Sequence, residues 1–174
     1  MASFYWFNNP MKDLVLINCW SMSAHESYAL WRIYLGGEQD GIAIKTTVSR
    51  LCRSVEYGGD EHPEEFFIGK VSYKTHINPD DLSRFSVITT KKPFYDFEKE
   101  VRMFVLNYPL SEGGHIPPYD MSLGRKVRVD LNELVHEVYI SPFSSKGYKE
   151  KVRSLIMQSN LKDILIKESE IRDQ

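Results

Sequence analysis

The segment EKEVRMFVL, residues 98–106, has the clearest strand pattern of this sequence. Its side chains separate with a period of two into an apolar set and a mixed set, as they do along a strand. The apolar set is Val101, Met103 and Val105, and the mixed set is Glu98, Glu100, Arg102 and Phe104. We therefore predict a strand whose mixed face carries the three charged side chains, successive ones about 7 Å apart.

The charged side chains on this face, Glu98, Glu100 and Arg102, leave two interpretations open. Two close carboxylates beside a guanidinium can hold a ribose diol, or separate their pKa values for acid–base chemistry. Alternatively, they form an exposed cross-strand ion pair that contributes less than about 1 kcal/mol. Phe104 belongs to the same predicted face and indicates that this face is partly covered. A covered pair of glutamates needs an explanation, which favours the first interpretation somewhat.

The segments before this strand alternate between strand and helix patterns. The apolar run 14–20 predicts a strand buried on both faces, because it shows no polar alternation. Ser23, followed three positions later by Glu26, predicts a capping box that begins a helix. Gly36 and Gly37 end that helix.

The C-terminal third predicts a strand over 135–142, an amphipathic helix over 144–160 and a strand over 161–171. Strand, helix and strand at this spacing are typical of a right-handed crossover. We expect one α+β domain over 14–174, after an irregular segment over 1–13. Its sheet should be mixed and mostly antiparallel, with a few packed helices and this one C-terminal strand–helix–strand unit.

Composition excludes several classes of protein. The 174 residues suffice for one domain with a core, and a net charge of −2 argues against a nucleic-acid binder. No apolar run reaches the 18 or so residues of a membrane span. We therefore expect no membrane partner, and the charge makes a nucleic-acid partner unexpected as well. No zinc spacing occurs, and Cys19 and Cys52 are expected to be free, buried thiols in the cytoplasm. We expect no metal site and no required cofactor.

Further candidate residues for binding a ligand lie outside the glutamate strand. Trp20, Trp31 and Tyr34 could form an aromatic wall on which a base or nicotinamide stacks, although aromatics at helical spacing are more often core. Ser21 lies on a strand-to-helix turn that could hold a phosphate or carboxylate. Lys91 and Lys92 precede the glutamate strand and could neutralise phosphates, or could keep a sheet edge soluble.

The order of NCWS, ESYALWRIY, GIAI, GKVSY, KKPFYDFEKEVR and VYISP, over roughly residues 14–170, resembles the domain of unknown function 2971 family of bacteria and their phages. That family's Asn-Asp-Pro motif lies well upstream of its Cys-x-Ser, whereas FNNP lies only a few residues before it here. The resemblance implies a shared site and names no reaction. Carried over position by position, it marks these residues: Cys19, Ser21, Trp31, Tyr34, Gly41, Tyr73, Lys92, Glu98, Glu100 and Arg102.

A fainter similarity links EKE and KTTVS to the ADP-ribosyltransferases. This similarity implies that Glu100 orients the nicotinamide ribose, that Tyr34 or Trp31 stacks on nicotinamide and that Arg102 supports the glutamate. The Arg or His that opens the family's first strand has no counterpart here, because Arg32 belongs to a predicted helix.

Three functions follow as hypotheses. The first is a small cytoplasmic enzyme that cleaves or transfers at a ribosyl centre of a nucleotide such as NAD, in a bacterial or phage conflict system. The second is a non-enzymatic ligand- or protein-binding module, because no nucleophile elbow, P-loop or zinc signature occurs. In the third, the aromatic segment FYWF docks on a second copy and forms a homo-oligomer. The enzymatic hypothesis requires that Trp31, Tyr34 and Glu100 line one cavity.

Overall fold

The computed structural model describes residues 15–55, 66–78, 83–106 and 127–171. The predicted irregular segment 1–13 lies outside these residues. The fold is α+β, and its strand pairs are mostly antiparallel, as predicted. The chain divides into two compact units, one formed by residues 1–23 and 58–126 and the other by residues 24–57 and 127–174. The described strands form three sheets, each within one unit.

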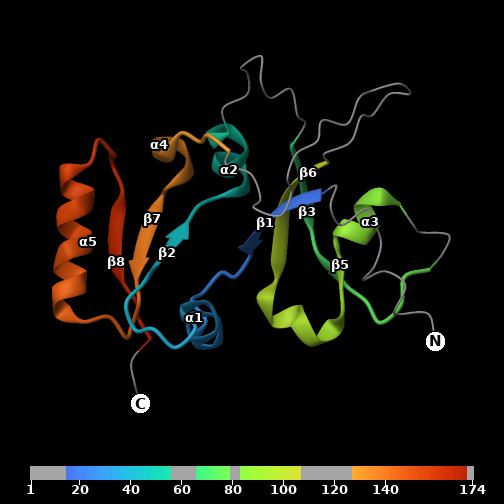
Figure 1. The fold of residues 1–174 in the computed structure, drawn as a ribbon, viewed down its shortest axis with the longest axis horizontal. Coiled ribbons are helices and arrows are strands. Elements are labelled where there is room, and N and C mark those ends of the chain that lie inside the picture. The colour runs from blue at the N-terminus through green and yellow to red at the C-terminus, as the bar shows by residue number, and fades with distance from the viewer. Residues whose placement is uncertain (1–14, 56–65, 79–82, 107–126, 172–174) are drawn as a thin grey trace. The chain divides into compact units, whose positions relative to one another are not determined.

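The first unit is built on a three-stranded antiparallel sheet of β1 (Val15–Ser21), β6 (Glu100–Leu106) and β3 (Phe66–Lys70), with β6 in the centre (Figure 1). A second, parallel pair joins β4 (Ser72–Tyr73) to β5 (Thr90–Lys91). Helix α3 (Arg84–Ile88) precedes β5, and the 3₁₀ helix η3 (Pro93–Glu98) joins β5 to β6.

One hydrophobic cluster of the first unit lies on the Phe104 face of β6, and Val101, Met103 and Val105 on its other face are buried as well. Phe104 and Ile88 are buried, and the ring of Phe67 stacks on that of Phe104 at a centroid distance of 5.6 Å. Phe85 of α3 lies against both rings, at 5.0 Å from Phe67 and 5.9 Å from Phe104. Helix α3 therefore covers the face that the sequence pattern marked as partly covered.

The predicted strand over 98–106 begins only at Glu100. Pro93 occupies the first turn of η3, where a proline's fixed φ and missing N–H are tolerated, and the helix continues to Glu98. Lys99 then adopts a left-handed conformation with φ of 44°, which turns the chain into β6. The prediction that Glu98 shares a strand with Glu100 and Arg102 is therefore wrong, although the alternation from Glu100 onward is confirmed.

Strand β1 forms as predicted, but the expectation that it is buried on both faces is wrong. Ile17 and Cys19 are exposed, because β1 lies at an edge of its sheet and pairs only with β6 in the described part of the chain. Cys52 is also exposed. Both cysteines are free, as predicted, but neither is buried.

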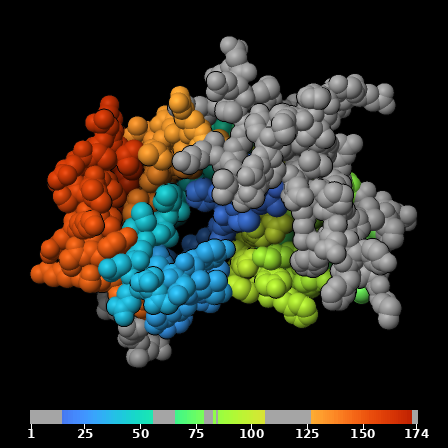
Figure 2. Space-filling model, viewed as in Figure 1, coloured from blue at the N-terminus to red at the C-terminus, as the bar shows by residue number. Residues whose placement is uncertain are grey.

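The second unit contains a sheet of β2 (Ile42–Lys45), β7 (Glu137–Ile140) and β8 (Leu165–Glu168). Strands β2 and β7 are antiparallel, whereas β7 and β8 are parallel and are joined through α5 (Lys146–Gln158). Glu168 of β8 forms ion pairs with Lys149 and Arg153, which connect α5 to the sheet. This arrangement confirms the predicted strand–helix–strand unit, and α5 lies at the surface of this unit in Figure 2.

Three further helices belong to the second unit: α1 (Tyr28–Leu35), α2 (Val48–Ser54) and α4 (Leu131–Leu134). Helix α1 is capped by Ser27, whose side chain accepts from the backbone N–H of Leu30. The predicted capping box of Ser23 and Glu26 is wrong, because Glu26 instead accepts hydrogen bonds from the Trp31 indole and the Glu170 backbone. Gly36, with φ of 59°, ends the helix as predicted.

The described residues include no helix that is both long and apolar enough to span a membrane.

Candidate functional site

A network of four charged side chains lies in the first unit, on the side of β6 that α3 covers. Lys91 comes from the end of β5, Glu98 from the end of η3, and Glu100 and Arg102 from β6. Lys91 forms an ion pair with Glu98, and its Nζ lies 3.5 Å from Oε2 of Glu100. Glu98 therefore joins the predicted site through Lys91, although its backbone does not belong to the strand.

The centre of the network is Glu100, whose side chain is only 6% exposed. Arg102 donates to both of its carboxylate oxygens, from Nε to Oε1 at 2.9 Å and from Nη2 to Oε2 at 3.0 Å. Cys19 of β1, which pairs with Arg102 in the sheet, also influences this carboxylate. Burial opposes the charge of Glu100, but the hydrogen bonds from Arg102 and Cys19, with the charges of Arg102 and Lys91, outweigh it and lower the Glu100 pKa.

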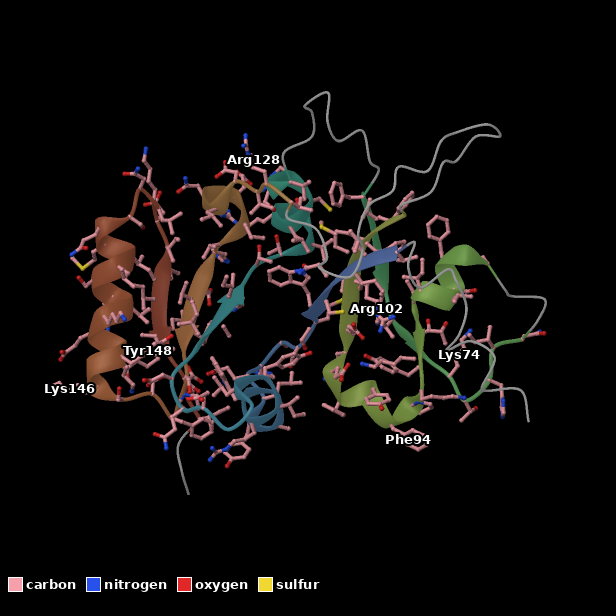
Figure 3. The ribbon with its side chains drawn as sticks, in the orientation of Figure 1. Lys74, Phe94, Arg102, Arg128, Lys146 and Tyr148 are labelled. Atoms are coloured by element: carbon pink, nitrogen blue, oxygen red, sulfur yellow. The ribbon has the colours of Figure 1, made fainter. Side chains whose placement is uncertain are left out.

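The partners of Glu100 are held from other elements. Arg102 also donates through Nη1 to the backbone carbonyl of Ile88, at the end of α3. Burial of Arg102 favours its neutral form, but the hydrogen bond and charge of Glu100 outweigh this and raise the Arg102 pKa. In Figure 3 the Arg102 side chain lies between β6 and the α3–β5 segment. Burial likewise opposes the charge of Lys91, but the hydrogen bond of Glu98 and the charges of Glu98 and Glu100 outweigh it and raise the Lys91 pKa.

Cys19, opposite Arg102 on the neighbouring strand, responds to the same cluster. Partial desolvation and the Glu100 carboxylate raise the pKa of the Cys19 thiol to about 11, against the opposing charges of Arg102 and Lys91. The thiol therefore stays protonated at neutral pH and acts as a donor rather than a nucleophile.

The side chains of two more predicted residues form hydrogen bonds with backbone atoms of Glu98 and Glu100. Ser21 Oγ donates to the carbonyl of Glu98 at 2.7 Å, and the Tyr73 hydroxyl accepts from the backbone N–H of Glu100 at 2.8 Å. The structure therefore brings together Ser21, Tyr73, Glu98, Glu100 and Arg102. Ser21 and Tyr73 stabilise the two ends of the η3–β6 connection.

The remaining predicted residues lie elsewhere. Lys92 donates to the carbonyl of Thr75 at 2.7 Å, outside the network. Trp20 pairs with Val101, so its side chain belongs to the opposite face of the sheet from Glu100. Its indole N–H binds Asn18.

Trp31 and Tyr34 belong to α1 of the second unit. Trp31 is 8% exposed and donates to Glu26 at 3.1 Å, whereas Tyr34 is 72% exposed. The two rings therefore do not present one common wall, and Trp31 is a core residue of its unit. That they line a cavity with Glu100 stays a prediction.

The sequence marks Lys91 only as a candidate phosphate or edge lysine, and its ion pairs with Glu98 and Glu100, like the turn that precedes Glu98, were not predicted. Lys91 Nζ lies 4.5 Å from the centre of the Tyr95 ring, and Phe94, Tyr95 and Phe97 of η3 are all exposed. We call these three side chains the aromatic turn. Phe94 is 82% exposed and projects away from the ribbon at the lower end of the first unit (Figure 3). The motif KKPFYDFE holds the signal, because three aromatics follow a proline between a lysine and a glutamate.

The geometry limits the chemistry of Glu100. An ionised carboxylate has about four acceptor positions; Arg102 donates to both oxygens of this one, and Lys91 Nζ lies 3.5 Å from Oε2. The two carboxylates and two cations of the network also balance in charge. A lowered pKa keeps Glu100 ionised at neutral pH, so it does not serve as a general acid.

Within the described ranges, no three His, Cys, Asp or Glu side chains gather as ligands of a metal ion.

The chain matches no protein-family model, no curated protein and no solved structure in comparisons with all three. The resemblance to the domain of unknown function 2971 family therefore stays a prediction.

Proposed function

We propose that this protein is a non-enzymatic binding module, in which the Glu100 network is structural and the aromatic turn is the recognition surface. The observation that carries the proposal is the closed coordination of Glu100. Because Arg102 binds both oxygens, Lys91 lies 3.5 Å from Oε2 and the side chain is only 6% exposed, this carboxylate is already engaged and is not presented to a ribose diol.

The network also holds the aromatic turn in place. Lys91 and Glu98 flank the turn in sequence, and their ion pair joins its two ends. Ser21 fixes the carbonyl of Glu98, and the Met22 N–H donates to the carbonyl of Lys99 at 2.8 Å. A turn held at both ends loses little conformational freedom when it binds, which favours affinity.

The aromatic turn has the composition of a protein-binding surface. Clusters of exposed apolar side chains commonly mark interaction sites, and aromatic residues supply most of the strongest contacts in protein interfaces. Phe94, Tyr95 and Phe97 are exposed within one helical turn, and Lys92 beside them is exposed as well. A protein partner with an apolar pocket suits this turn better than a small molecule does, because small molecules bind in concave sites.

The test compares two variants of matched exposure. Phe94→Ser removes the most exposed aromatic of the turn, and Met157→Ser removes an equally exposed side chain, 83%, from α5. Each purified protein is used to capture partners from the source cells, and a captured protein is then purified and titrated directly. We expect the titrated partner to bind wild type and Met157→Ser equally, and to bind Phe94→Ser at least tenfold more weakly. Equal binding by all three proteins would assign recognition to another surface.

The ribosyl-transfer enzyme is the second candidate. In its favour, one ammonium group, that of Lys91, bridges Glu98 and Glu100, so a substrate that displaced Lys91 would uncover both carboxylates at once. NAD consumption by wild type and by Glu100→Gln distinguishes the two candidates. We expect no consumption by folded wild type, and turnover that Glu100→Gln abolishes would replace our proposal with the enzymatic one.

A further inference from the structure

A second charged cluster lies in the other unit, on the face of the β2–β7–β8 sheet that is opposite α5. Strand register places Lys45 beside Glu137 and Lys167 beside Tyr139 on this face. Val138 and Ile140 alternate with these residues and are buried on the other face, to which the exposed Glu168, the partner of α5, also belongs. The cluster therefore belongs to the side of the sheet that α5 leaves uncovered.

Two ammonium groups converge on one oxygen in this cluster. Lys45 Nζ lies 3.2 Å and Lys167 Nζ 3.0 Å from the same Oε2 of Glu137. Both nitrogens also lie over the ring of Tyr139, at 5.8 Å and 5.6 Å from its centre. Tyr139 is among the groups that lower the pKa of Glu137 and raise that of Lys167. Two lysines are thus held around one acceptor, beside the ring of Tyr139.

The charge of this cluster is not balanced. Glu137 supplies one negative charge against two positive charges, in contrast to the neutral network around Glu100. The side chain of Glu137 is 7% exposed, whereas those of Lys45 and Lys167 are about half exposed and accessible to a ligand. Each ammonium has three donors, and one from each is used on Glu137. Positive charge and spare donors therefore face solvent at one place.

We infer that Lys45, Lys167 and Tyr139 form a binding site for a phosphoryl group. Its several oxygens around one centre allow one ligand to accept from both ammonium groups at once, beside the ring of Tyr139, which a single carboxylate oxygen does more poorly. Glu137 positions the two lysines and limits affinity by its own charge. The inference concerns a different unit from the aromatic turn and does not depend on the function proposed above.

The experiment titrates the ¹⁵N-labelled full chain with inorganic phosphate at constant ionic strength and follows the backbone amides by NMR. We expect saturating shifts centred on Lys45, Tyr139 and Lys167. Lys45→Gln and Lys167→Gln should each weaken binding about fivefold, as expected for one partly exposed charge. Lys146→Gln, at a fully solvated lysine of α5 (Figure 3), should leave it unchanged. Adenosine 5′-monophosphate in a parallel titration distinguishes a nucleotide from free phosphate, because only a nucleotide site binds it more tightly.

Glu137→Gln tests the same inference independently, because it keeps both lysines and removes the negative charge that competes with phosphate. We expect it to bind phosphate more tightly than wild type. Shifts that rise linearly without saturation, or that persist unchanged in both lysine variants, would overturn the inference and leave an ion triad that only stabilises the sheet.

Discussion

Arg102 donates two hydrogen bonds to the carboxylate of Glu100, at 2.9 Å and 3.0 Å. The two residues lie two positions apart on β6. The same guanidinium reaches the carbonyl of Ile88 and so connects β6 to α3. Through Lys91, Glu98 and Cys19 the pair extends to β5, η3 and β1. One buried carboxylate thus links most of the elements of the first unit.

Arg102→Lys should destabilise the protein by about 2–3 kcal/mol. A lysine keeps the charge but cannot reproduce the bidentate contact, nor reach Glu100 and Ile88 together. Urea unfolding measures the change in the free energy of unfolding. Arg53→Lys is the matched control, because Arg53 pairs with Glu133 at 3.1 Å through exposed side chains and should cost less than about 0.5 kcal/mol. Equal effects of the two substitutions would contradict the structural importance of the bidentate pair.

The thiol of Cys19 should be slow to alkylate in the folded protein. A pKa of about 11, against 9.0 for an ordinary thiol, leaves roughly 100-fold less thiolate at pH 8. Iodoacetamide labelling of Cys52→Ser, folded and in urea, isolates this thiol. Its folded-state rate should keep rising with pH up to about 11. A plateau near pH 9 would show that Glu100 does not influence the thiol.

Glu137 should make stability depend on acid pH. The hydrogen bond from Lys167, with further ones from Tyr139 and Lys45, outweighs burial and lowers its pKa from 4.5 to about 2. Because the folded-state value is the lower one, this stabilisation is complete above pH 4.5 and is lost as pH falls towards 2. Urea unfolding between pH 2 and pH 7 should therefore show a shallower acid decline for Glu137→Gln than for wild type. Parallel curves would contradict the assignment.

Substitutions of Lys99 test whether the backbone between η3 and β6 is left-handed in solution. With φ of 44°, Lys99→Gly should leave stability unchanged or raise it by up to about 1 kcal/mol. Lys99→Val should lower it by about 1–2 kcal/mol, because a β-branched side chain fits this conformation poorly. Thermal unfolding compares the two variants. A valine variant as stable as the glycine variant would show that the connection is not left-handed in solution.

Local patterns predicted much of the fold. The period of two in 100–106 and the strand–helix–strand order near the C-terminus both correspond to observed elements. The sequence pattern predicts the N-cap of α1 at Ser23, whereas the structure has it at Ser27. The reason is that Glu26 binds Trp31 and the distant Glu170 instead of a helix N-terminus. Such a long-range contact leaves no trace in local spacing.

The candidate site was predicted in part. Glu100 and Arg102 follow from strand alternation, whereas Glu98 reaches the network only through Lys91, across a 3₁₀ turn that hydrophobic periodicity does not reveal. Lys91 itself is positioned by the parallel pairing of β4 with β5, which joins segments far apart in sequence. The exposure of Ile17 and Cys19 follows from the edge position of β1, a property of sheet order rather than of composition.

The free energy of unfolding of Glu100→Gln tests the structural role of the network most directly. If Glu100 is the neutralising partner of Arg102, its loss leaves that guanidinium without its anion while Lys91 keeps Glu98, and stability should fall by about 2–4 kcal/mol. A catalytic carboxylate held under strain predicts the opposite, because its removal leaves stability unchanged or raises it. Unfolding of Glu100→Gln at the same urea concentration as wild type, or at a higher one, would contradict the account.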